Sequence, residues 1–326
     1  MQHEKVIIVG AGPCGMSCAI ELQQRGLDPL IIEKKNVVNT IYNYPTHQTF
    51  FSSSDKLEIG QVPFITEKQK PVRNQALAYY RTVAQRKNLR IRTYDEVKSI
   101  HKSHGSFLVN TKKGEFQADN VIIATGYYDQ PNLMGVPGEE LDKVMHYFKE
   151  AHPYFNKKVA VIGGKNSAVD ATLELYKAGA QVTVLYRGSE YSESIKPWIL
   201  PEFDSLVRKD AVHMEFNASV EKITTDALTY TAGGKTTTIS NDFVFAMTGY
   251  QPNYQLLKNV GISIDEETGE PFYNKNTMET NVAGMFIAGV VAAGYNNNKI
   301  FIENGRFHGG FIAETITSRL NAQHKL

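Results

Sequence analysis

The chain has 326 residues, 42% of them hydrophobic, which is enough to build the cores of about two domains of ordinary size. Its 35 basic and 34 acidic side chains nearly cancel, so the overall charge does not indicate nucleic acid as a partner. The only two cysteines, Cys14 and Cys18, argue against a secreted disulfide framework and a four-cysteine metal site. We therefore expect a protein of the reducing cytoplasm, without a secretory signal, a membrane span or a bound metal.

The N-terminal segment predicts one βαβ unit. Residues 5–10 form a continuous apolar run, typical of a strand buried on both faces of a parallel sheet. Residues 13–25 carry an apolar stripe at helical spacing and end at Gly26. Residues 29–33 form a second buried strand, so the order of elements is that of a dinucleotide-binding unit.

The turn between the first strand and the helix carries a glycine fingerprint, Gly10-Ala-Gly12-Pro13-Cys14-Gly15. The first glycine permits a tight turn, the second lets backbone approach a pyrophosphate, and the third lets the helix pack closely. Glu33 ends the second strand, where a carboxylate accepts hydrogen bonds from ribose hydroxyls and repels a 2′-phosphate. This unit is therefore predicted to bind FAD or NAD.

A second βαβ unit follows at residues 158–163, a helix to about Lys177, and residues 181–186. Gly163 lies 153 positions after Gly10, and the later unit repeats the order of the earlier one. The sequence therefore predicts an α/β fold with two Rossmann-like, three-layer dinucleotide-binding domains.

The second glycine-rich turn differs from the first in its chemistry. It reads Gly163-Gly164-Lys165-Asn166-Ser167-Ala168, so that Lys165 replaces the middle glycine. Its Cβ is expected to hinder the closest approach of backbone to phosphate, although its ammonium could contact the phosphate instead. Tyr186 stands where the first unit has Glu33, and Arg187 follows it. A guanidinium suits a ribose 2′-phosphate, so this unit is predicted to prefer NADPH, with Lys196 as a further basic contact. A solvated surface arginine is the alternative.

Two strands end alike and mark the predicted crossings between the domains. Short β segments are expected at residues 107–111, 121–124, 212–216, 227–231 and 243–246. Ala124-Thr125-Gly126 follows one of them and Thr248-Gly249 another. One domain is then formed by residues 1–126 and 250–326, with a last helix from about Glu303 to Leu320 packed onto it, and the other by residues 127–249.

These motifs, together with Met285-Phe-Ile-Ala-Gly289, resemble the thioredoxin-reductase-like flavoproteins over essentially the whole chain. The resemblance implies that an NADPH domain is inserted into a split FAD domain. Members that reduce thioredoxin carry a Cys-x-x-Cys before the first strand of the nicotinamide domain, whereas residues 145–155 contain no cysteine. Val290 also replaces an acidic residue that is common in the family, so contacts to the flavin ribityl chain must differ.

Four segments are more specifically similar to the bacillithiol disulfide reductases. They are Gly12-Pro-Cys-Gly15, residues 44–54, residues 163–168 and residues 302–310. The resemblance implies that NADPH and FAD are used to split the disulfide of a low-molecular-weight thiol, bacillithiol disulfide, with Cys14 as an active residue. Further cofactor contacts are expected at Gln48, Val97, Ala124, Thr125, Gly126, Thr248, Gly249 and Gly289.

The physical case for Cys14 rests on its place in the first turn of a helix, where the partial positive charge of the N-terminus stabilises a thiolate. The phosphates of bound FAD act in the opposite sense, and a small packing residue is the competing interpretation. Cys18, one turn later, is predicted to be a small buried hydrophobe.

Other functions and groups stay open at this point. The rival activities are a ferredoxin or flavodoxin reductase of the same type, a flavin monooxygenase, and a redox sensor that holds FAD without turnover. His47 and His308 could contact flavin or substrate, although a structural role competes for each. We expect a small-molecule disulfide as partner and a homo-oligomeric assembly.

Overall fold

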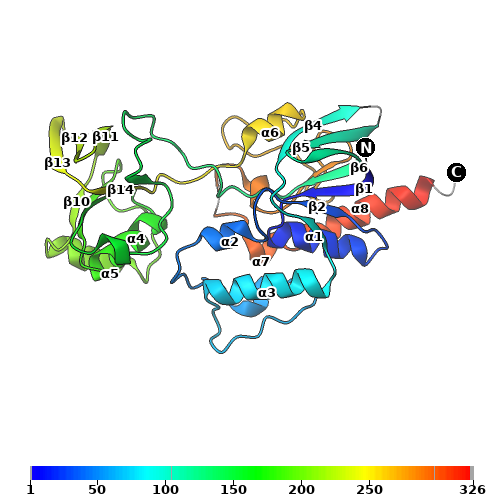
Figure 1. Cartoon of the computed structure of the whole chain (residues 1–326), viewed down its shortest axis with the longest axis horizontal. Coiled ribbons are helices and arrows are strands. Elements are labelled where there is room, and N and C mark those ends of the chain that lie inside the picture. Colours follow the sequence, from blue (N-terminus) through cyan, green and yellow to red (C-terminus); the bar gives the residue numbers. More distant parts are fainter. Residues whose placement is uncertain (1, 104, 297, 324–326) are drawn as a thin grey trace. The chain divides into compact units, whose positions relative to one another are not determined.

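The computed structural model describes residues 2–103, 105–296 and 298–323, and the chain separates into two compact units (Figure 1). The first unit comprises residues 1–42, 48–130 and 250–326, and the second comprises residues 43–47 and 131–249. The sequence placed the two crossings after Gly126 and Gly249; in the structure the units divide after Gln130 and Gly249.

The first unit is built on a seven-stranded sheet with the order β3-β2-β1-β6-β5-β4, in which β15 also pairs with β6. The strands β1, β2, β3 and β15 run parallel to their neighbours, and β4 and β5 form an antiparallel extension of β6. The bounds are β1 Gln2–Val9, β2 Leu30–Ile32, β3 Arg90–Arg92, β4 Val97–Ser103, β5 Ser106–Thr111, β6 Gly114–Ile123 and β15 Met285–Ile287. The predicted parallel βαβ core is confirmed.

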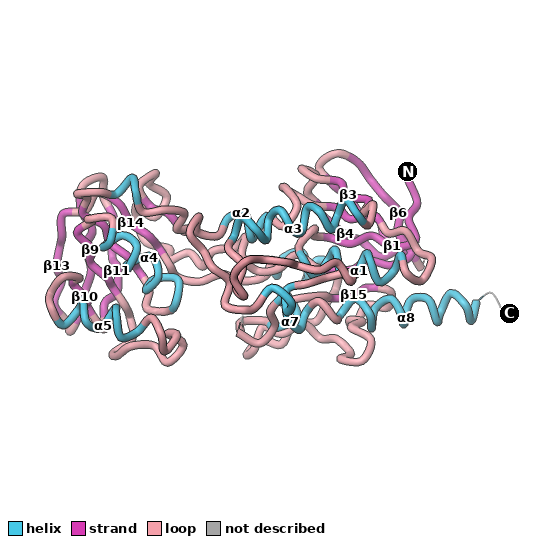
Figure 2. The backbone as a smooth tube through the Cα atoms, turned by 90° about the horizontal axis from the view of Figure 1, so that it is seen from below, coloured by secondary structure: helices cyan, strands magenta, loops and turns pink. Residues whose placement is uncertain are grey.

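Helices α1 and α8 lie side by side in the first unit (Figure 2). A Cβ on Gly309 of α8 would lie 2.8 Å from the Cα atom of Cys18 in α1, so only glycine permits this close crossing. The predicted last helix is therefore present and packs on the first unit, but it begins after a break that separates it from α7. The helical bounds are α1 Pro13–Gln23, α2 Asn39–Asn43, α3 Arg73–Arg86, α6 Tyr254–Asn259, α7 Ile302–Gly305 and α8 His308–Gln323, with short 3-10 turns η1 Ser54–Leu57 and η3 Val290–Ala293.

The second unit has a five-stranded parallel sheet with the order β10-β9-β8-β14-β7. A three-stranded antiparallel sheet, β11-β12-β13, accompanies it. The bounds are β7 Val144–Met145, η2 His152–Tyr154, β8 Lys158–Ile162, α4 Asn166–Lys177, β9 Gln181–Leu185, α5 Leu200–Arg208, β10 His213–Glu215, β11 Ala218–Ile223, β12 Ala227–Ala232, β13 Lys235–Ser240 and β14 Phe243–Ala246. The predicted second βαβ unit is therefore present as β8, α4 and β9.

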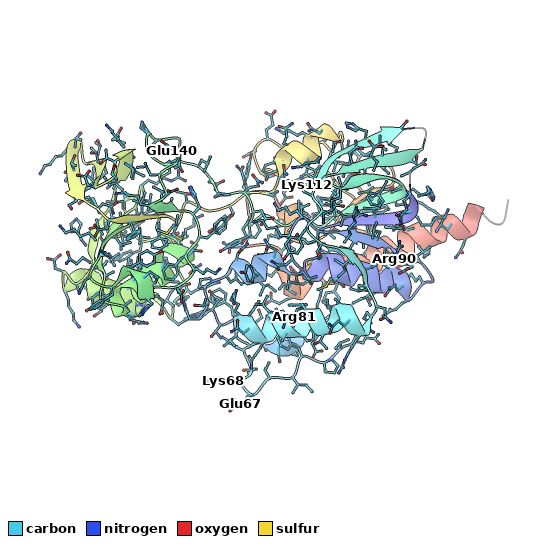
Figure 3. All side chains as sticks on the ribbon, in the orientation of Figure 1. Glu67, Lys68, Arg81, Arg90, Lys112 and Glu140 are labelled. Carbon is cyan, nitrogen blue, oxygen red and sulfur yellow. The ribbon has the colours of Figure 1, made fainter. Side chains whose placement is uncertain are left out.

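Buried apolar strands supply the cores, and polar contacts fix the sheet edges. In the first unit Arg90, labelled in Figure 3, makes two hydrogen bonds of 2.7 and 2.9 Å to the carboxylate of Glu4. This two-point contact joins β3 to β1 across β2. Within the described residues, no helix is both long and apolar enough to cross a membrane.

Candidate functional site

The glycine turn of the first unit leaves space at one glycine and none at the other two. A Cβ on Gly10 would lie 2.5 Å from the carbonyl oxygen of Ala124, and one on Gly15 would lie 2.1 Å from the carbonyl oxygen of Gly10. A Cβ on Gly12 would meet nothing within 4 Å. Gly10 and Gly15 are thus required by the packing of the protein itself, while the space over Gly12 suits a pyrophosphate at the N-terminus of α1.

The carboxylate of Glu33 is held in a fixed orientation beside this turn. The backbone N–H groups of Ala11 and Lys35 each donate to one of its oxygens at 2.9 Å, and the residue is only 8% exposed. Burial raises the pKa of Glu33, although these two hydrogen bonds act in the lowering direction. Each oxygen keeps acceptor capacity, so the carboxylate can receive ribose hydroxyls, as the sequence predicts.

A cavity of the first unit is lined by several predicted contacts, among them Gly10, Glu33, Val97, Thr125 and Gly126. Lys34 and Asp129 also line it and form an ion pair of 2.8 Å. Sequence reasoning missed this pair, because only the fold brings the residue after Glu33 against the segment after Gly126. The cavity follows the carboxyl ends of β1 and β2, where nucleotides bind in such sheets.

Gln48 lies outside that cavity lining. The side-chain amide of Gln48 donates to the backbone carbonyl oxygen of Thr49 at 2.8 Å. The backbone carbonyl oxygen of Gln48 accepts from the backbone N–H of Arg73 at 2.8 Å. These contacts give the residue a local structural role in the first unit, and its predicted contact with a cofactor stays a prediction.

The glycine-rich turn of the second unit has a backbone conformation similar to that of the first, but it exposes a lysine where the first has Gly12. A Cβ on Gly163 would lie 2.5 Å from the carbonyl oxygen of Met247, matching Gly10 against Ala124. Lys165 is exposed and has extended backbone angles, φ −106° and ψ −175°, close to those of Gly12 at φ −77° and ψ 174°. A side chain therefore fits at this position without strain, and its ammonium can stand beside a phosphate.

Tyr186 occupies the place that corresponds to Glu33. A Cβ on Gly164 or on Gly188 would each lie 2.4 Å from atoms of its ring, so the ring lies against two glycines. Arg187, between Tyr186 and Gly188, is exposed and available to an anion. The second unit thus presents an aromatic face and a guanidinium where the first presents a carboxylate.

The side chain of Asn166 forms hydrogen bonds with the loop that contains Ser194 and Lys196. Its side-chain amide donates to the carbonyl oxygen of Ser194 at 2.8 Å, and its side-chain oxygen accepts from the N–H of Lys196 at 2.9 Å. The Lys196 ammonium lies 5.9 Å from the ring centroid of Trp198. Asn166 therefore ties the start of α4 to the loop that carries Lys196, so a role in positioning that loop is added to its predicted cofactor contact.

The remaining predicted positions of the second unit lie at the start of α4 and at the end of the unit. Ser167 is exposed at the start of α4, whereas Ala168 is buried at 1% exposure and supports the helix packing. Asn132 donates to the backbone carbonyl oxygens of Gly249 at 2.9 Å and of Thr248 at 3.3 Å, and the Thr248 hydroxyl donates to the backbone carbonyl oxygen of Asn132 at 2.5 Å. These bonds fix the crossing segment.

Cys14 lies between two glycines of the first unit. A Cβ on Gly289 would lie 3.0 Å from its sulfur, and one on Gly305 would lie 2.9 Å from the same atom. Burial raises the pKa of the Cys14 thiol to about 12, so desolvation outweighs the expected stabilisation of the thiolate by the N-terminus of α1. By solvent exposure Cys14 is only partly buried, and its predicted active role stays a prediction. Cys18 is fully buried, as predicted.

This burial has a measurable consequence for the protein stripped of cofactors. With Cys18→Ala removing the second thiol, alkylation of Cys14 by iodoacetamide should be slow near pH 8, where roughly one thiol in ten thousand is ionised at a pKa of about 12. Its rate should keep rising about tenfold per pH unit from pH 7 to 10. A rate that levels off near pH 9, as for an ordinary cysteine, would contradict the burial.

His308 meets the same segment from α8. Its Nδ1 atom accepts a hydrogen bond from the N–H of Gly289 at 3.1 Å, which leaves Nε2 as the protonated nitrogen of the neutral ring. Burial lowers the pKa of His308, which also favours the neutral form. Gly289 has φ 77°, a left-handed conformation that glycine adopts without strain, and it lies between Cys14 and His308. His47 is exposed and its ring lies 6.1 Å from that of Phe148.

Comparison with known proteins decides the family. A family model described as pyridine nucleotide-disulphide oxidoreductase matches residues 7–289. The chain belongs to the pyridine nucleotide-disulphide oxidoreductase family. As a member of this family it is an oxidoreductase of the thioredoxin-reductase-like type, and FAD and NADPH are its cofactors. Among the described residues, no group of three or more His, Cys, Asp or Glu is arranged to hold a metal ion.

Similar members of this oxidoreductase family match the chain over almost its whole length. It is 64% identical over 323 residues to the Bacillus subtilis (strain 168) protein named Bacilliredoxin reductase Bdr, covering 98% of this chain and 100% of the relative. The structure titled Bacillithiol Disulfide Reductase Bdr (YpdA) from Bacillus cereus has a TM-score of 0.96 at 62% identity, covering 98% of this chain and 100% of that one. The structure of the same title from Staphylococcus aureus has a TM-score of 0.94 at 57% identity, covering 98% and 99%.

Proposed function

We propose that this chain reduces the disulfide of a low-molecular-weight thiol with electrons from NADPH, and that bacillithiol disulfide is the substrate. The observation that carries the proposal is the match over 98% of the chain, at 62% identity and a TM-score of 0.96, to a protein titled bacillithiol disulfide reductase. The two unlike dinucleotide sites support it from the residues themselves. A reducing cytoplasm is the setting in which such a reaction belongs.

The reaction balances without any further oxidant or reductant. One NADPH, one proton and one disulfide give NADP⁺ and two thiols. FAD, when bound, supplies the chemistry of taking a hydride from the nicotinamide and passing an electron pair on. The protein must hold both cofactors, exclude competing acceptors and deliver protons to the sulfur atoms.

The residues divide this work between the two units. In the first unit the space over Gly12 and the carboxylate of Glu33 are suited to the pyrophosphate and the ribose of FAD. In the second unit Lys165 and Arg187 supply the positive charge that a 2′-phosphorylated dinucleotide needs.

We assign Cys14 the thiol chemistry because Cys18 is fully buried in α1 and the family's usual dithiol pair is missing. The Cys14 sulfur would attack one sulfur of the substrate, form a mixed disulfide and release the first thiol. The electron pair derived from NADPH would then cleave that mixed disulfide, release the second thiol and return Cys14 to its starting state. Because burial raises the pKa of Cys14 to about 12, its proton must leave as the new bond forms, and the first thiol takes up one proton as it is released, so that this step balances.

Anaerobic turnover of the FAD-loaded enzyme with NADPH and bacillithiol disulfide tests this function. The wild type and the matched Cys18→Ala variant should both oxidise NADPH and release two thiols per NADPH. Cys14→Ala should lose at least about a hundredfold in turnover, because it has no thiol to form the mixed disulfide. Full activity of Cys14→Ala would remove this residue from the mechanism, and no activity in the wild type would remove the substrate.

The name of the B. subtilis relative, bacilliredoxin reductase, supports a second candidate acceptor of electrons, a bacilliredoxin. The same turnover assay should therefore include, as an alternative substrate, a bacilliredoxin that carries bacillithiol in a mixed disulfide. Reduction of ferredoxin is measured as a further comparison. Faster reduction of the protein disulfide would make a protein the substrate. Assembly into a homo-oligomer remains a prediction.

A further inference from the structure

The side-chain amide of Asn39, at the start of α2, is buried without a partner for its nitrogen. Asn39 is 7% exposed, and its oxygen accepts a hydrogen bond of 3.0 Å from the side-chain amide of Asn36. Within the part of the chain that the structure describes, Asn39 Nδ2 has no acceptor. In the amide orientation of the structure Asn39 accepts from Asn36 through its oxygen, so the group left without a partner is the donor nitrogen. A buried donor that is unpaired costs free energy, so its retention needs an explanation.

The residue before Asn39 places this donor beside the glycine turn of the FAD unit. The N–H of Val38 donates to the carbonyl oxygen of Ala11 at 3.0 Å, and Ala11 is the residue between Gly10 and Gly12. Val38 is 1% exposed and has φ 50°, a left-handed conformation that a β-branched residue rarely adopts. Strained residues of this kind persist where the surrounding structure fixes them, and they cluster at ligand sites.

The strained backbone of Val38 and the unpaired nitrogen of Asn39 thus occur in consecutive residues. They lie beside the glycine turn, in which the space over Gly12 is open. We propose that Asn39 Nδ2 donates a hydrogen bond to bound FAD, to an oxygen in the segment from the pyrophosphate to the ribityl chain. The inference rests on the FAD site of the proposed function. The strained Val38 and the brace from Asn36 hold the amide with its nitrogen toward that acceptor, so the unpaired donor of the protein alone becomes paired in the holoenzyme.

Other orphaned polar atoms in the described residues do not share this setting. The unpaired atoms of Asn110 and Asn241 are acceptor oxygens, and each of these side chains already donates through its nitrogen. The unpaired Tyr254 hydroxyl lies beside Gly269, and His146 belongs to the second unit. The Nε of Arg306 is an unpaired donor too, but its guanidinium already donates through Nη1 to the carbonyl oxygens of Asp55 and Glu58. Asn39 alone among these combines an orphaned amide donor with contact of its neighbour to the glycine turn.

The test compares Asn39→Ala and Asn39→Asp with wild type in two measurements, the dissociation constant of FAD and the melting temperature with and without FAD. Asn39→Ala should weaken FAD binding about tenfold or more, and Asn39→Asp more strongly, because a carboxylate repels the pyrophosphate. Without FAD, Asn39→Ala should change the melting temperature little, because removal of the unpaired buried donor offsets the loss of the hydrogen bond from Asn36; with saturating FAD it should melt clearly below the wild type. Asn321→Ala, an exposed asparagine of α8, should change neither measurement.

The outcomes separate the inference from the function on which it rests. A loss of stability for Asn39→Ala that is equal with and without FAD would assign Asn39 a purely structural role and overturn the inference. Unchanged FAD affinity would overturn it as well. Failure of the wild type itself to bind FAD would instead overturn the FAD site, and NADPH binding by the second unit would show that the protein is folded.

Discussion

Gly15→Ala is expected to lower the melting temperature of the protein by roughly 5 °C or more and to abolish retention of FAD. The new Cβ would lie 2.1 Å from the carbonyl oxygen of Gly10, a backbone atom that cannot move without shifting the end of β1. Overpacking of this kind costs about 1 to 3 kcal/mol and sometimes more, which is a large share of the stability of one domain. Because the same turn receives the pyrophosphate, the distortion and the loss of cofactor should occur together.

Gly12→Ala is the matched control, three residues before Gly15 in the same turn. Its Cβ would meet no protein atom within 4 Å, so the melting temperature without FAD should stay within about 1 °C of the wild type. The same methyl group would occupy space meant for the pyrophosphate, so FAD affinity should still fall. Differential scanning fluorimetry and flavin fluorescence measure the two effects. Equal destabilisation by both substitutions without FAD would contradict the different roles assigned to the two glycines.

These glycines show why much of the FAD unit was predictable from the sequence. A turn that needs close packing, a helix that starts beside it and an acid at the end of the next strand are local features with fixed spacing. Gly10 and Gly15 therefore have the close packing that the sequence indicates, and Glu33 lies beside their turn, where its contact with ribose stays a prediction.

Features that depend on distant segments were not predictable in the same way. The environment of Cys14 is set by Gly289 and Gly305, which lie 275 and 291 residues further along the chain, so its raised pKa could not be predicted from the turn itself. The orphaned amide of Asn39 has no sequence signal at all, because asparagine before a helix also serves as an ordinary cap. Burial and partners, which only the fold determines, distinguish these cases.

The second turn shows what the glycine pattern leaves open, since the hindrance expected from Lys165 stays a prediction. The sequence suggested that the side chain of Lys165 hinders close approach to phosphate, because glycine is usual at that position. The backbone there is extended in both units, however, and Lys165 points its bulk to the exterior without strain. The middle glycine of the turn leaves space for a ligand, but the backbone at that position does not require glycine. A lysine therefore fits there and adds a positive charge.

Arg187→Ala is expected to weaken the binding of NADPH about 10- to 100-fold and to leave NADH almost unchanged. A charge-assisted contact to the 2′-phosphate contributes about 1.5 to 3 kcal/mol, and only NADPH carries that group. Dissociation constants for both nucleotides, measured by quenching of protein fluorescence, give the result directly. Equal losses for the two would mean that Arg187 is a solvated side chain without a role in selection.

Tyr186→Glu tests the same selection from the opposite side. Tyr186 and Gly164 lie 153 positions after Glu33 and Ala11, so the substitution restores the pair in which a backbone N–H donates to a carboxylate. The new acid should accept the ribose hydroxyls of NADH and repel the 2′-phosphate of NADPH, and preference should shift toward NADH by about tenfold or more. Gly188→Ala provides the control for the ring, because its Cβ would lie 2.4 Å from Tyr186 and displace it without adding charge. If Gly188→Ala weakens both nucleotides alike while Tyr186→Glu exchanges their order, charge at this position selects the nucleotide and the two glycines only hold the ring. If Tyr186→Glu leaves the order unchanged, selection depends on Arg187 and Lys165 instead.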